Sequence, residues 1–162
     1  MSMLLYQIPR EAQRERRRFS VVGFDPADGR RSAELAIEPG LRFHLPKGAT
    51  LLSSQLSGGR LDEWLSEEQE RFGNRLWLLI EPVCHVLPLP CPDGQGEVIS
   101  EKESLALQSC HICYDAPELC CKYCTFQTNE KYYVHLFDTE QSMKMKLDLA
   151  ISLQIDNIIY IM

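Results

Sequence analysis

Five of the seven cysteines of this 162-residue chain fall within a single stretch of fifteen residues. They include two Cys-x-x-Cys pairs, Cys110 with Cys113 and Cys121 with Cys124. A pair of this spacing can turn both sulfurs toward one centre, and two such pairs complete the tetrahedron that a structural Zn²⁺ prefers. The sequence therefore predicts about one structural zinc per chain, with Cys120 as an alternative ligand to Cys121.

Four thiolates would close the coordination sphere, which leaves no open position for water or substrate. The sequence also contains no phosphate-binding loop, nucleophile elbow or pair of catalytic carboxylates. These features predict a protein that is not an enzyme. Two alternatives to zinc remain open, a redox-active dithiol and cysteines without any ligand.

Two known zinc motifs resemble parts of this stretch. Cys110-His-Ile-Cys113-Tyr-Asp resembles the opening of a RING domain, but the later cysteine and histidine pairs of that domain are missing. Cys121-Lys-Tyr-Cys124-Thr-Phe resembles the first half of a Cys2His2 finger, but His135 is the only histidine that follows it. A zinc ribbon at about 108–126 is the remaining interpretation.

Composition and charge limit the remaining possibilities. The chain has 44% hydrophobic and 25% charged residues and a net charge of −6, which suits a globular domain and does not suit general attraction to nucleic acid. Residues 1–18 carry five arginines and two glutamates and are predicted to form a basic, flexible arm before a domain at 19–162. An odd number of cysteines and the lack of an export or membrane signal favour reduced thiols and a nuclear location, or alternatively a cytosolic one.

The elements that would position the cysteines are mostly strands. Apolar and alternating runs predict strands near 19–24, 32–38, 41–45 and 49–56, each followed by Pro, Gly or Asp turn residues. One helix is predicted from Leu61 to Phe72, where apolar residues recur at helical spacing, and Gly73-Asn74 would end it. The apolar run 75–87 predicts a buried strand interrupted near Pro82. Cys84 and His85 within this run are interpreted as core residues, and so is His44 of the earlier strand.

The C-terminal part has the most regular pattern. Residues 132–137 predict a strand, and from Met143 to Ile155 apolar residues occupy every second position. Strict period two is typical of a strand with one buried face. The sequence therefore predicts a hairpin, followed by an apolar end that is buried or pairs with a partner.

The arrangement of these elements resembles the zinc-bearing OB domain of the replication protein A large subunit and of related telomere and break-repair factors. The shared features are strands, a four-cysteine insert and then a hairpin of the Tyr-Tyr-Val-His-Leu-Phe-Asp-Thr kind. The resemblance implies a mainly β fold, a small OB-like barrel with an inserted four-cysteine zinc ribbon and one helix. It also implies a non-catalytic subunit or scaffold of a nuclear DNA-maintenance complex, which would contact protein partners.

Single-stranded nucleic acid is a candidate ligand, because such sites combine basic side chains with aromatic rings for base stacking. The alternative is a protein-protein interaction adapter with a structural zinc and no nucleic-acid role, and neither hypothesis involves a membrane. The candidate nucleic-acid residues lie within or just after the ribbon: Lys122, Lys131, Tyr132, Tyr133, Phe137, Lys144 and Lys146.

Overall fold

The computed structural model of the chain describes the backbone of residues 4–8, 34–38 and 41–44, and residues 45–161 apart from 57, 93 and 95. The strand predicted near 19–24 and the arginines of the predicted basic arm lie outside the described residues.

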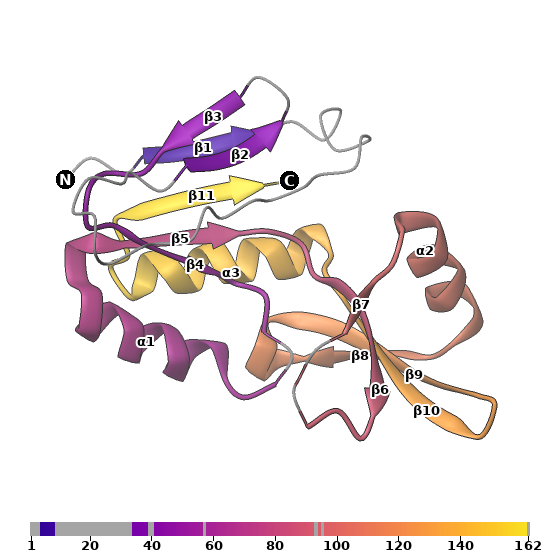
Figure 1. Cartoon of the computed structure of the whole chain (residues 1–162). Coiled ribbons are helices and arrows are strands. Elements are labelled where there is room, and N and C mark those ends of the chain that lie inside the picture. The colour runs from indigo at the N-terminus through magenta and orange to yellow at the C-terminus, as the bar shows by residue number, and fades with distance from the viewer. Residues whose placement is uncertain are drawn as a thin grey trace.

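One half of the fold is a four-stranded parallel sheet in the order β1-β11-β5-β4 (Figure 1). Parallel neighbours need crossover connections, and helices α1 and α3 provide them. The elements are β1 (Leu4–Ile8), β4 (Thr50–Ser53), α1 (Leu61–Phe72), the 3₁₀ turn η2 (Gly73–Arg75), β5 (Leu76–Ile80), α3 (Glu140–Ser152) and β11 (Asn157–Ile161).

The parallel sheet is buried on both faces at its centre. Every residue of β5 is buried, as expected for a strand of a parallel sheet, and this confirms the buried strand predicted after residue 75. Both α1 and α3 lie on one face of the sheet (Figure 1), where Leu65, Leu78 and Ile158 belong to the largest hydrophobic cluster. On the opposite face Trp77 and Ile159 belong to a second cluster.

Helix α1 begins and ends where the sequence predicts. Leu61 and Leu65 are fully buried, and Trp64 and Phe72 pack against the same cluster. At the C-terminus the backbone N–H of Gly73 donates to the carbonyl of Gln69, with Gly73 at φ 54°. A positive φ favours glycine, so this residue ends the helix as expected.

The other half is a five-stranded antiparallel sheet in the order β7-β6-β10-β9-β8, inserted between β5 and α3. Its elements are β6 (Cys84–Leu89), β7 (Glu97–Val98), α2 (Glu101–Cys110), β8 (Cys113–Ala116), the 3₁₀ turn η3 (Pro117–Leu119), β9 (Cys121–Thr128) and β10 (Lys131–Phe137). A separate pair is formed by β2 (Glu34–Glu38) and β3 (Leu41–His44).

The strand predicted at 132–137 is confirmed as β10, but its hairpin partner is different. It pairs with β9 through Asn129 and Glu130, both at positive φ. Two central residues at positive φ are the geometry of a type I′ turn, whose twist matches that of the flanking strands. The sequence analysis placed the partner strand after β10, where the structure has a helix.

The predicted strand from Met143 to Ile155 is wrong, because most of this segment is helix α3. Its buried residues Met143, Lys146 and Ala150 follow helical spacing, whereas Met145 and Ile151 are 43% and 45% exposed. Met, Lys, Leu and Ala are good helix formers, and the segment is poor in the β-branched residues that favour strands. Local propensity and the N-terminal cap therefore prevailed over the alternating pattern.

The expected OB-like barrel is also wrong. The described strands form two open sheets and a two-stranded pair, with three α-helices, and no barrel closes among them. The coarser expectation of a strand-rich fold holds. None of the helices in the described part of the chain is long and apolar enough to cross a membrane.

Candidate functional site

The carboxyl ends of β4 and β5 carry a group of polar side chains. Ser53 and Glu81 are brought together there, and the Ser53 hydroxyl donates a hydrogen bond of 2.7 Å to Oε1 of Glu81. The Ser54 hydroxyl accepts from the backbone N–H of Glu81 at 3.4 Å. In α/β sheets, ligands bind outside the carboxyl ends of the strands, which makes this edge the first place to look for a site.

Gln55 also contacts the segment that follows β5. Its Nε2 donates to the carbonyl of Pro82 at 2.8 Å, and its backbone N–H donates to the Ser53 hydroxyl at 3.1 Å. Ser53, Ser54 and Gln55 thus make three separate contacts with Glu81-Pro82. The segment after β4 therefore holds the Glu81 carboxylate in place at the end of the neighbouring strand β5.

A pocket of about 410 Å³ lies between this edge and the antiparallel sheet. Small ligands are usually bound in concave sites of this size that combine apolar walls with a few polar groups. Gly96 allows the loop before β7 to approach β6, since a Cβ there would lie 2.9 Å from Cγ of Leu87. The lining residues are Ser53, Gln55, Leu56, Glu81, His85, Gly94 and Gly96.

His85 is the second titratable group of the pocket. Its pKa is lowered, mainly by burial and also by the nearby His135. The imidazole is therefore neutral near pH 7 and suited to accept or donate one hydrogen bond at each nitrogen. The apolar run around His85 predicts a core residue, but in the structure His85 is half-buried in a pocket wall.

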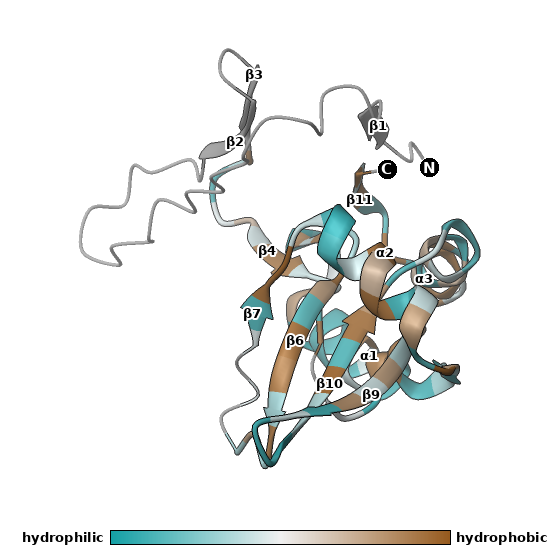
Figure 2. Cartoon of the chain, turned by 90° about the vertical axis from the view of Figure 1, so that its right-hand side faces the viewer, coloured by the Kyte–Doolittle hydropathy of each residue, from teal (hydrophilic) through white to brown (hydrophobic). Residues whose placement is uncertain are grey.

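Cys84 does not act with His85, because neighbouring residues of a strand point to opposite faces of a sheet. Burial raises the pKa of the Cys84 thiol, and the nearby Ser104 hydroxyl of α2 opposes part of that shift. On this same face the Ser104 hydroxyl lies 2.8 Å from Nε2 of the fully buried His135, whose Nδ1 lies 3.2 Å from the carbonyl of His85. These contacts hold α2 against the sheet, and Figure 2 shows α2 beside the part of the sheet formed by β6, β10 and β9.

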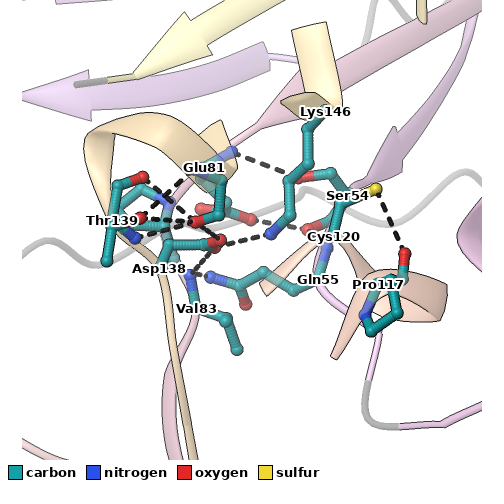
Figure 3. A network of polar contacts seen from close by, with 12 residues as sticks. Ser54, Gln55, Glu81, Val83, Pro117, Cys120, Asp138, Thr139 and Lys146 are labelled. Carbon is teal, nitrogen blue, oxygen red and sulfur yellow. Dashed lines mark hydrogen bonds and ion pairs between the residues drawn. The ribbon is translucent and has the colours of Figure 1, made fainter. Parts of the chain in front are cut away.

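A buried ion pair between Lys146 and Asp138 contacts the backbone next to the pocket (Figure 3). Nζ of Lys146 lies 2.5 Å from Oδ2 of Asp138, and that carboxylate also accepts from the backbone N–H of Val83 at 2.8 Å. Val83 follows the Glu81-Pro82 segment directly. The pair therefore connects α3 and the end of β10 to the backbone that carries the pocket carboxylate.

The structure does not gather the four predicted zinc ligands. Cys110 is exposed at the end of α2, whereas Cys121 is buried in the core beside Leu136. Cys121 and Cys124 both lie in the continuous strand β9, and side chains three positions apart in a strand point to opposite faces. Only Cys113 and Cys124 face each other, as direct partners of β8 and β9.

The zinc ribbon is accordingly wrong as a description of this segment. Among the described residues there is no group of three or more His, Cys, Asp or Glu side chains that could hold a metal ion. Burial raises the pKa of Cys121 to about 12, and burial together with the neighbouring Cys113 raises that of Cys124 to about 11, so both are thiols near pH 7. The Cys-x-x-Cys spacing predicted turns, but the second pair forms a strand.

The candidate nucleic-acid residues do not form one surface. Three of them are committed elsewhere, since Phe137 is buried, Lys146 pairs with Asp138 in the interior, and Lys122 pairs with Asp115. Lys144 pairs with Asp148 on the exposed side of α3.

The remaining three candidates lie on β10. Tyr132 and Lys131 are exposed. Tyr133 stacks on Phe126, with 5.4 Å between the ring centroids. Tyr132 and Tyr133 are consecutive residues of the strand and therefore point to opposite faces.

Ser53 and Glu81 were not among the candidate residues predicted from the sequence. The signal for them was present, since Ser53-Ser54 and Glu81-Pro82 each follow an apolar run and a helix separates the two runs. A strand, a helix and a strand in this order indicate parallel strands, whose carboxyl ends meet at one edge.

Comparison with known proteins gives structural matches only. No protein-family model matches the chain, and no curated protein does. The putative sporulation-specific glycosylase YdhD from Bacillus subtilis is similar over 69% of this chain and 43% of its own, with a TM-score of 0.50 and 10% identity. The spore cortex-lytic enzymes SleL from Bacillus megaterium and Bacillus cereus each match 70% of this chain, 30% and 31% of their own, at TM-scores of 0.49 and 12% identity.

The chain thus spans less than half of the length of each of these structures, and the likeness to YdhD concerns the fold. That fold corrects the expected resemblance to OB domains of replication protein A and its relatives. The expectations built on that resemblance are contradicted with it, since the fold is similar to that of a structure described as a glycosylase and not to an OB domain. The expected non-enzymatic DNA-maintenance module in the nucleus was implied by the OB resemblance, and it is corrected together with that resemblance.

Proposed function

We propose that the pocket at the carboxyl edge of the parallel sheet binds a glycan and that Glu81 exchanges a proton with the bound sugar. The observation that carries the proposal is the placement of Glu81, which follows β5, is held by Ser53 at 2.7 Å, and lines a pocket of about 410 Å³. The likeness in fold to a structure described as a glycosylase supports the choice of ligand class.

The chemistry of the pocket suits a ligand rich in hydroxyl groups. Ser53 and Gln55 offer donors and acceptors, Glu81 offers acceptors, and the neutral imidazole of His85 offers one of each. Leu56 and the two glycines leave an apolar wall for the ring face of a sugar.

Glycoside hydrolysis generally uses two carboxyl groups, one to protonate the leaving oxygen and one as nucleophile or base. Glu81 is the one carboxylate among the described residues that line this pocket. We assign it the proton-transferring part of the chemistry and assign the other residues to ligand binding.

Binding is tested by isothermal titration calorimetry with soluble oligomers of N-acetylglucosamine and of glucose. We expect Glu81→Ala to weaken binding by about ten- to a hundredfold, because a hydrogen bond to a charged group contributes about 1.5–3 kcal/mol. Glu67→Ala, on the exposed side of α1, is the matched control and should bind as the wild type does. Failure of the wild type to bind any oligomer would overturn the proposal.

Proton transfer is tested separately by the release of reducing ends from the oligomer that binds. Glu81→Gln keeps the shape and most hydrogen bonds of the side chain but cannot exchange a proton, so we expect retained binding with lost hydrolysis. Equal hydrolysis by Glu81→Gln and wild type would remove Glu81 from the chemistry while leaving the binding site in place.

A further inference from the structure

Two thiols face each other across β8 and β9 on the side of the antiparallel sheet away from the pocket residue His85. Cys113 and Cys124 are direct partners in the antiparallel register, and both are free cysteines. Cys113 is also close enough to Cys124 to contribute to the raised pKa of the Cys124 thiol. Directly opposed residues of an antiparallel pair have Cα atoms about 4.5–5.5 Å apart. A disulfide needs about 4.4–6.8 Å, so this pair can be bridged without moving the strands.

The other cysteines fit a bridge less well. Cys120 and Cys121 are consecutive, and adjacent Cα atoms lie about 3.8 Å apart, below the usual disulfide range. Cys121 also points to the opposite face from Cys124. Cys84 is on β6, which β10 separates from β9, so it lies about two strand spacings of 4.8 Å from Cys124.

Cys110 is the one real competitor for Cys113. It is exposed at the end of α2 and three residues away in the chain. Its thiol contacts the Ser109 hydroxyl, whereas the Cys113 thiol contacts the backbone carbonyls of Gln108 and His111. These contacts direct the two sulfurs to different neighbours, and Cys124 remains the thiol that Cys113 faces.

We propose that Cys113 and Cys124 form a reversible disulfide when the protein meets a hydroperoxide. Cys113 is half-buried and Cys124 is 0% exposed, so Cys113 is the thiol that the oxidant reaches. Its thiolate attacks the peroxide, the O–O bond breaks, and a sulfenic acid forms as the alcohol or water leaves. The sulfur of Cys124 then attacks the sulfenic sulfur, the S–S bond forms, the S–O bond breaks, and the hydroxyl leaves as water with the proton of Cys124.

A disulfide between Cys113 and Cys124 would link the edge strand β8 covalently to β9. β8 is the last strand of the five-stranded sheet, and η3 connects it to β9 within the closed loop. Residues of this loop line a second pocket of about 550 Å³, which includes Pro117, Glu118 and Cys120. Oxidation should therefore restrict the motion of one wall of that pocket, and a dithiol reductant should restore it.

The test is disulfide mapping of the wild-type chain after hydrogen peroxide, with a chelator present and the remaining thiols alkylated. Cleavage at Lys122, Lys131, Glu103 and Glu118 separates Cys110 and Cys113 from Cys120 and Cys121, and both pairs from Cys124. We expect the fragment 104–118 to be joined to the fragment that begins at Tyr123, and dithiothreitol to separate them.

Three variants identify the sulfurs. Cys110→Ser should form the same cross-link as the wild type, which leaves Cys113 as the only cysteine of its fragment. Cys113→Ser and Cys124→Ser should each abolish it. The proposal would be overturned by a bridge within 104–118, by a bridge to Cys120 or Cys121, or by thiols that all remain free. It would also be overturned if the bridge formed only in protein that has already unfolded, as shown by the absence of a thermal unfolding transition. Mapping of the wild type needs no substitution, so the cross-link between fragment 104–118 and the fragment of Cys124 is established without relying on how the variants fold.

Discussion

Lys146 and Asp138 form an ion pair inside the protein, with Nζ and Oδ2 2.5 Å apart and side chains 2% and 0% exposed. The carboxylate is further satisfied by the backbone N–H of Val83 and the hydroxyl of Ser142. The segment before β6 thus meets the end of β10 and helix α3, which are far from it in the sequence, at one carboxylate (Figure 3).

Lys146→Met should strongly destabilise the protein, because it leaves the Asp138 charge buried without its partner. Breaking one side of a buried ion pair costs about 3–5 kcal/mol of unfolding free energy, measured by urea denaturation. The double change Lys146→Met with Asp138→Asn should recover part of this loss, since it removes the unpaired charge. Lys144→Met, whose ion pair with Asp148 is exposed, is the control and should change stability little. Equal effects of Lys146→Met and Lys144→Met would contradict the buried pair.

Thr139→Ala should weaken helix α3 at its N-terminus. The Thr139 hydroxyl accepts from the backbone N–H of Ser142, and the Ser142 hydroxyl accepts from the N–H of Thr139 in a reciprocal capping box. Loss of such a cap costs about 1 kcal/mol. Thr139→Asn retains a capping oxygen and should keep most of the stability in thermal melts followed by circular dichroism. If 143–155 were a strand, as its alternating pattern predicts, the two variants would not differ in this order.

Stability should fall on acidification through the titration of His135. Its pKa is lowered from the usual 6.5, chiefly by burial, so below about pH 6.5 the unfolded chain binds a proton that the folded chain does not. The contribution of His135 to the unfolding free energy is therefore constant above about pH 6.5. It decreases as the pH falls from there toward the lowered pKa of His135 in the folded protein. Urea titrations at a series of pH values measure the slope. His135→Gln should flatten it, and an unchanged slope in that variant would exclude His135 as its source.

The zinc content of the chain stays a prediction from the sequence. It is tested by metal analysis and by a double-mutant cycle that measures the stability of Cys110→Ser, Cys121→Ser and the double variant. In a shared zinc site the first substitution already removes the metal, so the two losses of stability would not add. In the structure the two side chains contact different elements, with Cys110 exposed after α2 and Cys121 buried in β9. We expect their effects to add within about 0.5 kcal/mol.

The sequence by itself determined the elements whose local signals agree with one another. Helix α1 has apolar residues at helical spacing and a glycine at its end, and β5 is a short apolar run before Glu81-Pro82. In both segments the residues that must be buried also favour the backbone they adopt. Local interactions and burial then select the same structure, so the pattern alone was sufficient.

Only the tertiary structure decided the segments where two signals compete. In 143–155 the alternation fits a strand while local propensity and the cap fit a helix, and the burial of Lys146 against Asp138 in the tertiary structure agrees with the helix. The Cys121 and Cys124 pair fits a zinc turn, but pairing of β9 with both β8 and β10 extends the backbone and sends the two sulfurs to opposite faces. Glu81 meets Ser53 because β4 and β5 run parallel, and pairing between distant strands is not encoded in the spacing of either one.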